Sequence, residues 1–178
     1  QKDTPLQACA YLGRLAEGFP DSPQAKPGLM LAVQISAKLC QDRPNNQAAE
    51  QYCFKALERL MSRYPDAEQA TTHWRFYWAG LLSKRGELAR ADEQFGQISK
   101  DHPLYVQARY YQLNLRRQLI DSQSAPDKAP AYARLAQKFS ALDSYVRSGM
   151  GPAEQADETA RNFGARARLK AVRIFCVE

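Results

Sequence analysis

Three segments of the chain share one spacing of small, large and proline residues. In each, a small residue is followed by larger apolar residues four and seven positions later, and by a proline five positions further on. The sets are Ala8, Leu12, Leu15 and Pro20; Cys53, Leu57, Leu60 and Pro65; and Ala91, Phe95, Ile98 and Pro103. The first three positions of each set lie on one face of an α-helix. Proline ends a helix because it has no N–H to donate and its ring clashes with the preceding turn. The spacing therefore predicts repeated helices that stop at fixed points.

The rest of the sequence predicts an all-α chain. Apolar residues recur at helical intervals, and no segment alternates apolar and polar residues as a strand would. The expected helices cover about 4–19, 28–39, 49–64, 67–84, 87–100 and 105–120. Because a single helical pair cannot bury both of its apolar faces, we expect the pairs to stack into an array.

The pattern becomes less regular after Ile120. A polar loop at 121–127 is followed by a shorter expected helix at 130–139, and then by a stretch at 140–151 that we expect to be irregular or broken. Gly151-Pro152 is expected to open a long last helix that ends near 175. We therefore predict helical repeats over 1–120 and a less regular helical extension, packed on the array, over 121–178.

One segment, 74–103, resembles a unit of the tetratricopeptide repeat (TPR) family. That family has an aromatic residue, then Leu-Gly and Tyr, followed by Ala, Phe, Ala and Pro at fixed spacing. Here Trp78-Ala79 stands at the Leu-Gly position, Leu82 at the Tyr position and Gly86 at the turn within the pair. The set that ends at Pro103 completes the unit in register. Residues 4–120 as a whole resemble the family more loosely, and they look like the helical arrays of bacterial TPR-like proteins.

The resemblance implies a fold and a class of function. The fold would be antiparallel helical pairs stacked as a short right-handed solenoid, and its concave face would bind a peptide or a partner domain. The chain would then be a non-catalytic scaffold whose partner is another protein or peptide segment. A purely structural spacer within a multidomain protein is the alternative that needs no ligand.

Two rows of side chains are candidates for the concave face. Trp74 and Trp78 continue an apolar stripe and are interpreted as core. The other side of that helix carries His73, Tyr77, Gly80 and Lys84, and the next candidate helix carries Tyr110, Asn114 and Arg117. Aromatic rings beside amide and cationic donors suit an extended peptide. An ordinary solvated face, with tyrosines packing at its edge, is the alternative reading. Gly80 is expected either to permit close helix approach or to leave room for a ligand.

The last expected helix is basic and amphipathic. Its cations are Arg161, Arg166, Arg168, Lys170 and Arg173. We interpret them as a solvated face, with contact to an acidic partner protein or to RNA as the second possibility and a membrane surface as the third. The net charge of +6 permits an acidic partner without requiring one.

Catalytic and cofactor-binding patterns were sought, and none is present. The chain has two histidines, His73 and His102, and neither has a second ligand at metal spacing. Glycine-rich phosphate loops and nucleophile motifs are absent, and Asp92 and Glu93 are interpreted as solvated. We therefore expect no enzyme activity, no small-molecule substrate, no cofactor and no metal.

The four cysteines are Cys9, Cys40, Cys53 and Cys176. They form no C-x-x-C pair and are interpreted as small buried apolar residues. A Cys40–Cys53 disulfide is the alternative, in an oxidising compartment. No apolar run approaches the roughly 18 residues that span a bilayer. The chain opens on Gln1 and closes on an apolar stretch at 172–177, so we expect it to be part of a longer protein. The sequence indicates no compartment.

Overall fold

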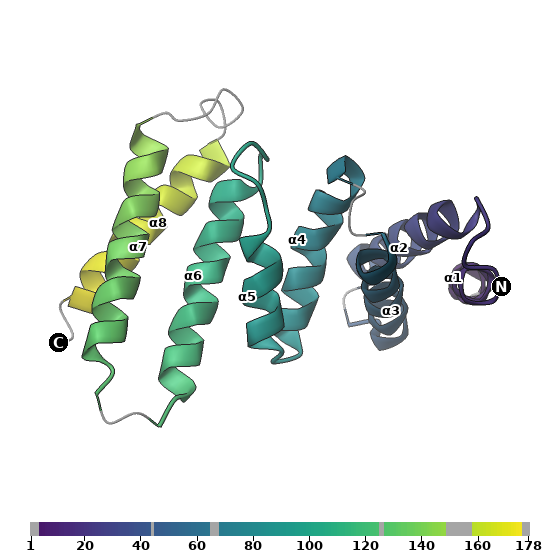
Figure 1. The fold of residues 1–178 in the computed structure, drawn as a ribbon, viewed down its shortest axis with the longest axis horizontal. Helices are drawn as coiled ribbons and strands as arrows, with labels where there is room; N and C mark the ends of the chain where they lie inside the picture. Colours follow the sequence, from purple (N-terminus) through teal and green to yellow (C-terminus); the bar gives the residue numbers. More distant parts are fainter. Residues whose placement is uncertain (1–3, 44, 65–67, 125–126, 149–157, 176–178) are drawn as a thin grey trace. The chain divides into compact units, whose positions relative to one another are not determined.

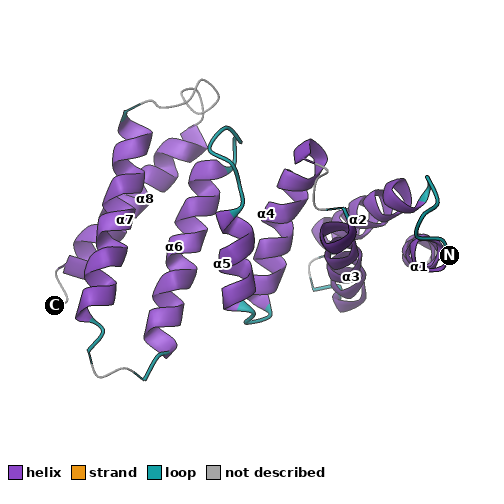
Figure 2. Cartoon of the chain, viewed as in Figure 1, coloured by secondary structure: helices purple, strands orange, loops and turns teal. Residues whose placement is uncertain are grey.

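The computed structural model describes residues 4–43, 45–64, 68–124, 127–148 and 158–175, and side chains from all of these except 68–72 and 175. The described chain is helical, with no strand among those residues (Figures 1 and 2). The α-helices are α1 (Thr4–Gly18), α2 (Ala25–Asp42), α3 (Gln47–Arg63), α4 (Glu68–Lys84), α5 (Leu88–Gly96), α6 (Tyr105–Ser122), α7 (Ala129–Arg147) and α8 (Glu158–Phe175). The all-α prediction is confirmed for this part of the chain.

The chain divides into two compact units, residues 1–74 and 75–178, and the division falls inside α4. The expected division at residue 120 stays a prediction. Within the second unit, α6 packs against both α7 and α8, which follow that position in the sequence.

The first unit has a core between α1, α2 and α3. Leu29, Val33, Leu57 and Leu60 are almost completely buried. Asn46 caps α3 by accepting a hydrogen bond on its side-chain oxygen from the backbone N–H of Ala49, at 3.1 Å. This bond satisfies one of the N–H groups that the first turn of a helix leaves without an intrahelical acceptor.

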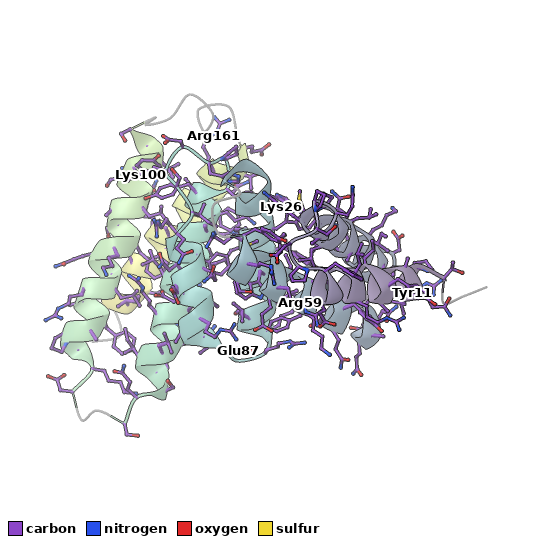
Figure 3. All side chains as sticks on the ribbon, turned by 45° about the vertical axis from the view of Figure 1, so that its right-hand side comes forward. Tyr11, Lys26, Arg59, Glu87, Lys100 and Arg161 are labelled. Carbon is purple, nitrogen blue, oxygen red and sulfur yellow. The ribbon has the colours of Figure 1, made fainter. Side chains whose placement is uncertain are left out.

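Charged pairs link α3 to α1 and to the turn that follows α1 in this unit. The guanidinium of Arg59, which is labelled in Figure 3, pairs with Glu17 across the two helices. Arg63 makes a second, longer pair with Asp21 at 3.4 Å. Exposed pairs of this kind contribute at most about 1 kcal/mol each, so the apolar core carries the stability of the unit.

The repeated spacing has the expected burial in two of its three copies. The buried copies are Cys53, Leu57 and Leu60, and Ala91, Phe95 and Ile98. In α1 the predicted positions are only half-buried, and the buried face lies one residue further along, at Cys9, Gly13 and Ala16. The pattern identified the helix correctly and misplaced its core face by one position.

Helix α5 ends at Gly96, four residues earlier than predicted. Side chains of α6 take the carbonyls of its last turn: Gln112 Nε2 donates to the Asp92 oxygen at 3.0 Å, and Arg109 Nη2 donates to the Gly96 oxygen at 3.2 Å. A continued helix would give the Gly96 carbonyl to the backbone N–H of Lys100 instead, whereas the Asp92 carbonyl, four residues before Gly96, is already within the intrahelical ladder. Ile98 is still buried, in the turn that follows.

The prediction of an irregular stretch at 140–151 was wrong for residues 140–147. Helix α7 runs unbroken to Arg147, and the expected opening of the last helix at Gly151-Pro152 lies outside the described residues. Ser140 and Ser144 are exposed, whereas Leu142 and Asp143 are buried. Asp143 accepts two hydrogen bonds of 3.0 Å from Arg168 of α8. This tertiary contact accommodates a polar run that local sequence preferences do not favour as helix.

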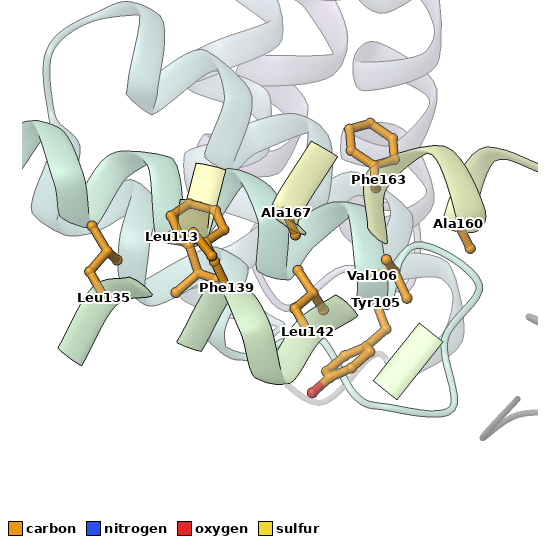
Figure 4. Packing of buried hydrophobic residues seen from close by; sticks show 10 residues of the cluster. Tyr105, Val106, Leu113, Leu135, Phe139, Leu142, Ala160, Phe163 and Ala167 are labelled. Atoms are coloured by element: carbon orange, nitrogen blue, oxygen red, sulfur yellow. The ribbon is translucent and has the colours of Figure 1, made fainter. Parts of the chain in front are cut away.

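The core of the second unit lies between α6, α7 and α8 (Figure 4). Its buried residues include Val106, Leu113, Phe139, Leu142 and Phe163. Gly164 lies where α8 approaches α7, because a Cβ built on it would lie 3.0 Å from both Cβ and Cγ1 of Val146. Glycine at this position therefore permits the close approach of the two helices.

The cysteine prediction is confirmed in part. Cys9 and Cys53 are buried, Cys40 is half-buried, and the structure describes all three as thiols, so the alternative Cys40–Cys53 disulfide is not formed. Burial raises the pKa of the Cys9 thiol, with a smaller opposing contribution from its backbone hydrogen bond. Cys176 lies outside the described residues.

Candidate functional site

A hollow of about 320 Å³ lies between α4 and α6, within the second unit. We call it the α4–α6 groove. Its lining residues come from three helices: Phe76, Gly80 and Ser83 from α4, Phe95 from α5, and Gln107, Tyr111, Asn114, Leu115 and Gln118 from α6. Its surface combines aromatic rings with uncharged polar groups.

The aromatic part of the groove is a connected set of rings. Phe76 lies 5.4 Å from Phe95 and 6.0 Å from Tyr111, measured between ring centroids. Phe95 and Tyr111 stack at 5.9 Å, and Tyr111 continues to Phe163 of α8 at 5.7 Å. Phe95 is buried, while Tyr111 keeps 39% of its surface exposed. The groove therefore has a fixed apolar floor and one tyrosine that is accessible to a ligand.

The polar part consists of three amide side chains on one stripe of α6. These are Gln107, Asn114 and Gln118. Asn114 donates from Nδ2 to the Tyr110 carbonyl at 2.8 Å, and this bond orients the amide and leaves Oδ1 to accept. A primary amide offers both a donor and an acceptor, the combination that a peptide group requires of a partner.

Gly80 lies in the interior of α4 and lines the groove. A Cβ built on it would meet no atom within 4 Å, so close helix approach does not explain the glycine. A mid-helix glycine costs about 1 kcal/mol relative to alanine. Of the two explanations expected from the sequence, only space beside the helix agrees with the geometry.

Six residues were predicted to bind a partner on the concave face, and the structure does not bring them together: His73, Tyr77, Lys84, Tyr110, Asn114 and Arg117. Asn114 lines the groove, whereas Tyr77, Tyr110 and Arg117 do not, although all three are half-buried. The Tyr110 ring packs 6.1 Å from Phe139 and 5.2 Å from Phe163, against the core.

The charged members of the predicted set are elsewhere. Arg117 pairs with Asp121 at 3.7 Å, and Lys84 is exposed at the end of α4. His73 belongs to the first unit, where its ring lies 5.5 Å from that of Trp74. As partner-binding residues, all six stay predictions.

Sequence reasoning missed Phe76 and Tyr111. Both are next to predicted residues, Tyr77 and Tyr110, which do not line the groove, whereas Gly80 and Asn114 of the same predicted rows do line it. A signal was present in α6: Tyr111 lies three positions after Ala108 and four before Leu115, so it shares a helix face with these two apolar residues.

The basic residues of α8 have different surroundings. Arg168 is held by the buried carboxylate of Asp143, and the Arg166 guanidinium lies 5.4 Å from the centre of the Phe163 ring. Arg161 and Arg173 are exposed. Burial lowers the pKa of Lys170, and the like charges of Arg117 and Arg173 lower it further.

We expect Lys170→Gln to stabilise the protein slightly at pH 7. A lysine whose pKa is lowered by folding opposes folding while it is protonated, and the penalty fades as the pH rises through its folded pKa towards the ordinary value near 10.4. Because the side chain is partly exposed, the gain in free energy of unfolding should not exceed about 0.5 kcal/mol. Thermal unfolding of both proteins between neutral and strongly alkaline pH measures it. A destabilised variant at pH 7, or a gain that grows with pH, would contradict this assignment.

The histidines make no metal site with other ligands in the described ranges. The Nδ1 atom of His102 accepts a hydrogen bond from the backbone N–H of Leu104 at 3.1 Å, at the start of α6. Over the residues that the structure describes, no group of three or more histidine, cysteine, aspartate or glutamate side chains is placed to hold a metal ion. The helices in the same ranges are too short or too polar for any of them to cross a bilayer.

Comparison with known proteins gives no relative. No protein-family model, no curated protein and no solved structure matches this chain.

Proposed function

We propose that this chain is a non-catalytic protein-interaction module, built as a short TPR-like solenoid, that binds an extended peptide segment of a partner protein in the α4–α6 groove. The observation that carries the proposal is Gly80, a glycine in the middle of a helix that leaves open space between aromatic and amide side chains.

The chemistry of the groove suits a peptide. The exposed part of Tyr111 and the ring of Phe76 offer contact area to one apolar side chain of the partner. Tyrosine provides such area at low entropic cost because it has few rotatable bonds. The amides of α6 can pair with the N–H and C=O groups of the partner's backbone, which need partners once they leave water.

The packing within the second unit supports the solenoid. Helix α6 packs against α5 and α7, and α8 packs against α7 and α6. Phe163 of α8 lies beside Tyr110 and Tyr111 of α6, and Lys170 of α8 lies in the field of Arg117 of α6. The step from Tyr110 to Arg117 along α6 and the step from Phe163 to Lys170 along α8 are both seven residues towards the C-terminus. Helices α6 and α8 therefore run in the same direction, and α7 is the antiparallel helix between them in the sequence. This is the alternation expected of stacked helical pairs.

Two variants test the groove. Peptides would be selected from a displayed random library on the unmodified protein, and their dissociation constants measured by calorimetry. We expect Gly80→Leu to weaken binding at least about tenfold, a loss of about 1.4 kcal/mol, because the new side chain occupies the groove. The same substitution should raise the free energy of unfolding by about 0.5–1 kcal/mol, since leucine is the better helix former. Tyr111→Ala should also weaken binding by removing the exposed ring.

Tyr52→Ala is the matched control, because Tyr52 has 37% of its surface exposed and lies in the first unit. It should leave the affinity within about twofold, an amount below about 0.5 kcal/mol. A selected peptide that binds Gly80→Leu as tightly as the unmodified protein would refute the groove. Failure to select any peptide would favour the spacer.

The second candidate function is contact with an acidic protein or RNA through the basic residues of α8. The cluster of Lys170 with Arg117 and Arg173 favours it, because like charges gathered at one place attract an anion. Binding of RNA would weaken steeply between low and moderate salt and would be lost on nuclease treatment. Binding in the α4–α6 groove should change little under either condition, since no charged residue lines it.

A further inference from the structure

A second hollow of the same unit is lined by cations. It has a volume of about 340 Å³ and lies between α6, α7 and the segment that follows α5. Its charged residues are Lys100, Arg109, Arg116 and Lys138, and no aspartate or glutamate lines it. We call it the cationic pocket. Lys100, which lies beyond the end of α5, is labelled in Figure 3.

The two arginines of the cationic pocket are held in place by the protein. Arg116 donates from Nε and Nη2 to the carboxylate of Asp92, at 2.7 and 3.2 Å. Asp92 was interpreted from the sequence as solvated, and this pair corrects that interpretation. Arg109 donates to Gln112 Oε1 at 2.7 Å and to the Gly96 carbonyl, and its guanidinium lies 5.0 Å from the centre of the Tyr105 ring. Their positions are therefore fixed before any ligand arrives.

The two lysines differ from the arginines because no side chain of the described residues holds them in place. Lys100 and Lys138 are exposed, and the described residues give neither of them a hydrogen bond or an ion pair. The carboxylate of Asp92 neutralises the charge of Arg116. The other three cations of the lining form no ion pair with an acid among the described residues. Each ammonium has three N–H donors and can turn towards a ligand.

Two tyrosines complete the wall. Tyr105 and Tyr145 make an edge-to-face contact at 5.3 Å, and both line the pocket together with Leu113 and Leu142. A tyrosine hydroxyl can donate a hydrogen bond to an anion. The aromatic ring excludes water from the wall of the pocket, and interactions between charges are stronger where water is excluded.

We propose that the cationic pocket binds a phosphoryl group. A phosphoryl group carries up to two negative charges and three acceptor oxygens, whereas a carboxylate carries one charge and two oxygens. Fixed arginines and mobile lysines together suit the larger anion, since arginine presents planar donors and lysine acts as a movable point charge. This site is independent of the α4–α6 groove, which shares none of its lining residues.

The phosphoryl group has two sources, a phosphorylated side chain of a protein or a free phosphate compound. Calorimetry on the full chain at about 0.15 M salt, where exposed charges are screened beyond about 8 Å, would compare pyrophosphate with a phosphoserine peptide and its unphosphorylated form. Tighter binding of the peptide identifies the first source, and tighter binding of pyrophosphate identifies the second. Either result supports the site, provided that the unphosphorylated peptide does not bind.

The decisive variant is Lys100→Gln/Lys138→Gln, which removes two exposed cations without disturbing the buried core. We expect the dissociation constant for pyrophosphate to rise at least about tenfold. Lys38→Gln/Lys55→Gln makes the same change in net charge at exposed positions of the first unit and should leave it within about twofold. The proposal is overturned if neither pyrophosphate nor the phosphoserine peptide shows saturable binding at millimolar concentration, or if both double variants weaken binding equally. Backbone amide shifts on titration should centre on Arg109, Lys138 and Tyr145, and shifts confined to α8 would also overturn it.

Discussion

Phe139→Ala should lower the free energy of unfolding by about 3–5 kcal/mol, the range for removing a buried aromatic ring. Phe139 is fully buried in the core that α6, α7 and α8 share, and the ring of Tyr110 packs against it. The substitution removes the apolar contacts and leaves a space that the surrounding helices can close only in part. Urea unfolding followed by circular dichroism measures the effect.

Two further variants make this result interpretable. Leu169→Ala removes an apolar side chain from α8 that is 62% exposed, and it should cost no more than about 0.5 kcal/mol. Phe139→Leu retains most of the apolar volume and should cost less than Phe139→Ala. Equal losses for Phe139→Ala and Leu169→Ala would mean that α7 does not pack as described.

Gly164→Ala should destabilise the protein by about 1–3 kcal/mol, the usual cost of overpacking, although alanine is the better helix former by about 1 kcal/mol. The added Cβ would meet three atoms of Val146 within 3.2 Å. One of them is the Val146 Cβ, which rotation of the side chain cannot move away, so α8 must shift relative to α7. Thermal unfolding of the single variant measures the cost.

The steric explanation has its own test in a second substitution. Val146→Ala removes both γ carbons, so Gly164→Ala should cost less in a Val146→Ala background than in the unmodified protein. The coupling between the two positions should be at least about 0.5 kcal/mol, as for residues in direct contact. Additive effects would show that Val146 does not limit the approach of α8.

The sequence was sufficient to predict most of the helices, because the end of a helix depends largely on the residues near it. Prolines beyond the first turn and turn clusters stop a helix, and α1, α3 and α6 end within two residues of their predicted ends. The end of α5 could not be predicted, because the side chain of Arg109 from α6 takes its last carbonyl, that of Gly96. The continuity of α7 was missed because Asp143, a polar residue in a polar run, is paired with an arginine 25 positions away.

The groove was less predictable than the helices. A helical row names side chains that share a face, but a rotation of one residue, about 100°, turns that face towards a different neighbour. Tyr110 and Tyr111 are adjacent and chemically identical, and the packing of α7 and α8 decides that Tyr110 lies against the core. Gly80 was identified correctly as a position that required an explanation. Choosing between its two explanations required the surrounding atoms.

Position 80 has a consequence for evolution. Almost any substitution there would make α4 a better helix and would also narrow the space beside Phe76 and Tyr111. Selection for thermal stability alone should therefore fill this position early, while selection for an open groove should keep the glycine. At this single position a more stable helix and an open groove require different residues. The glycine in this chain keeps the groove open at the expense of helix stability.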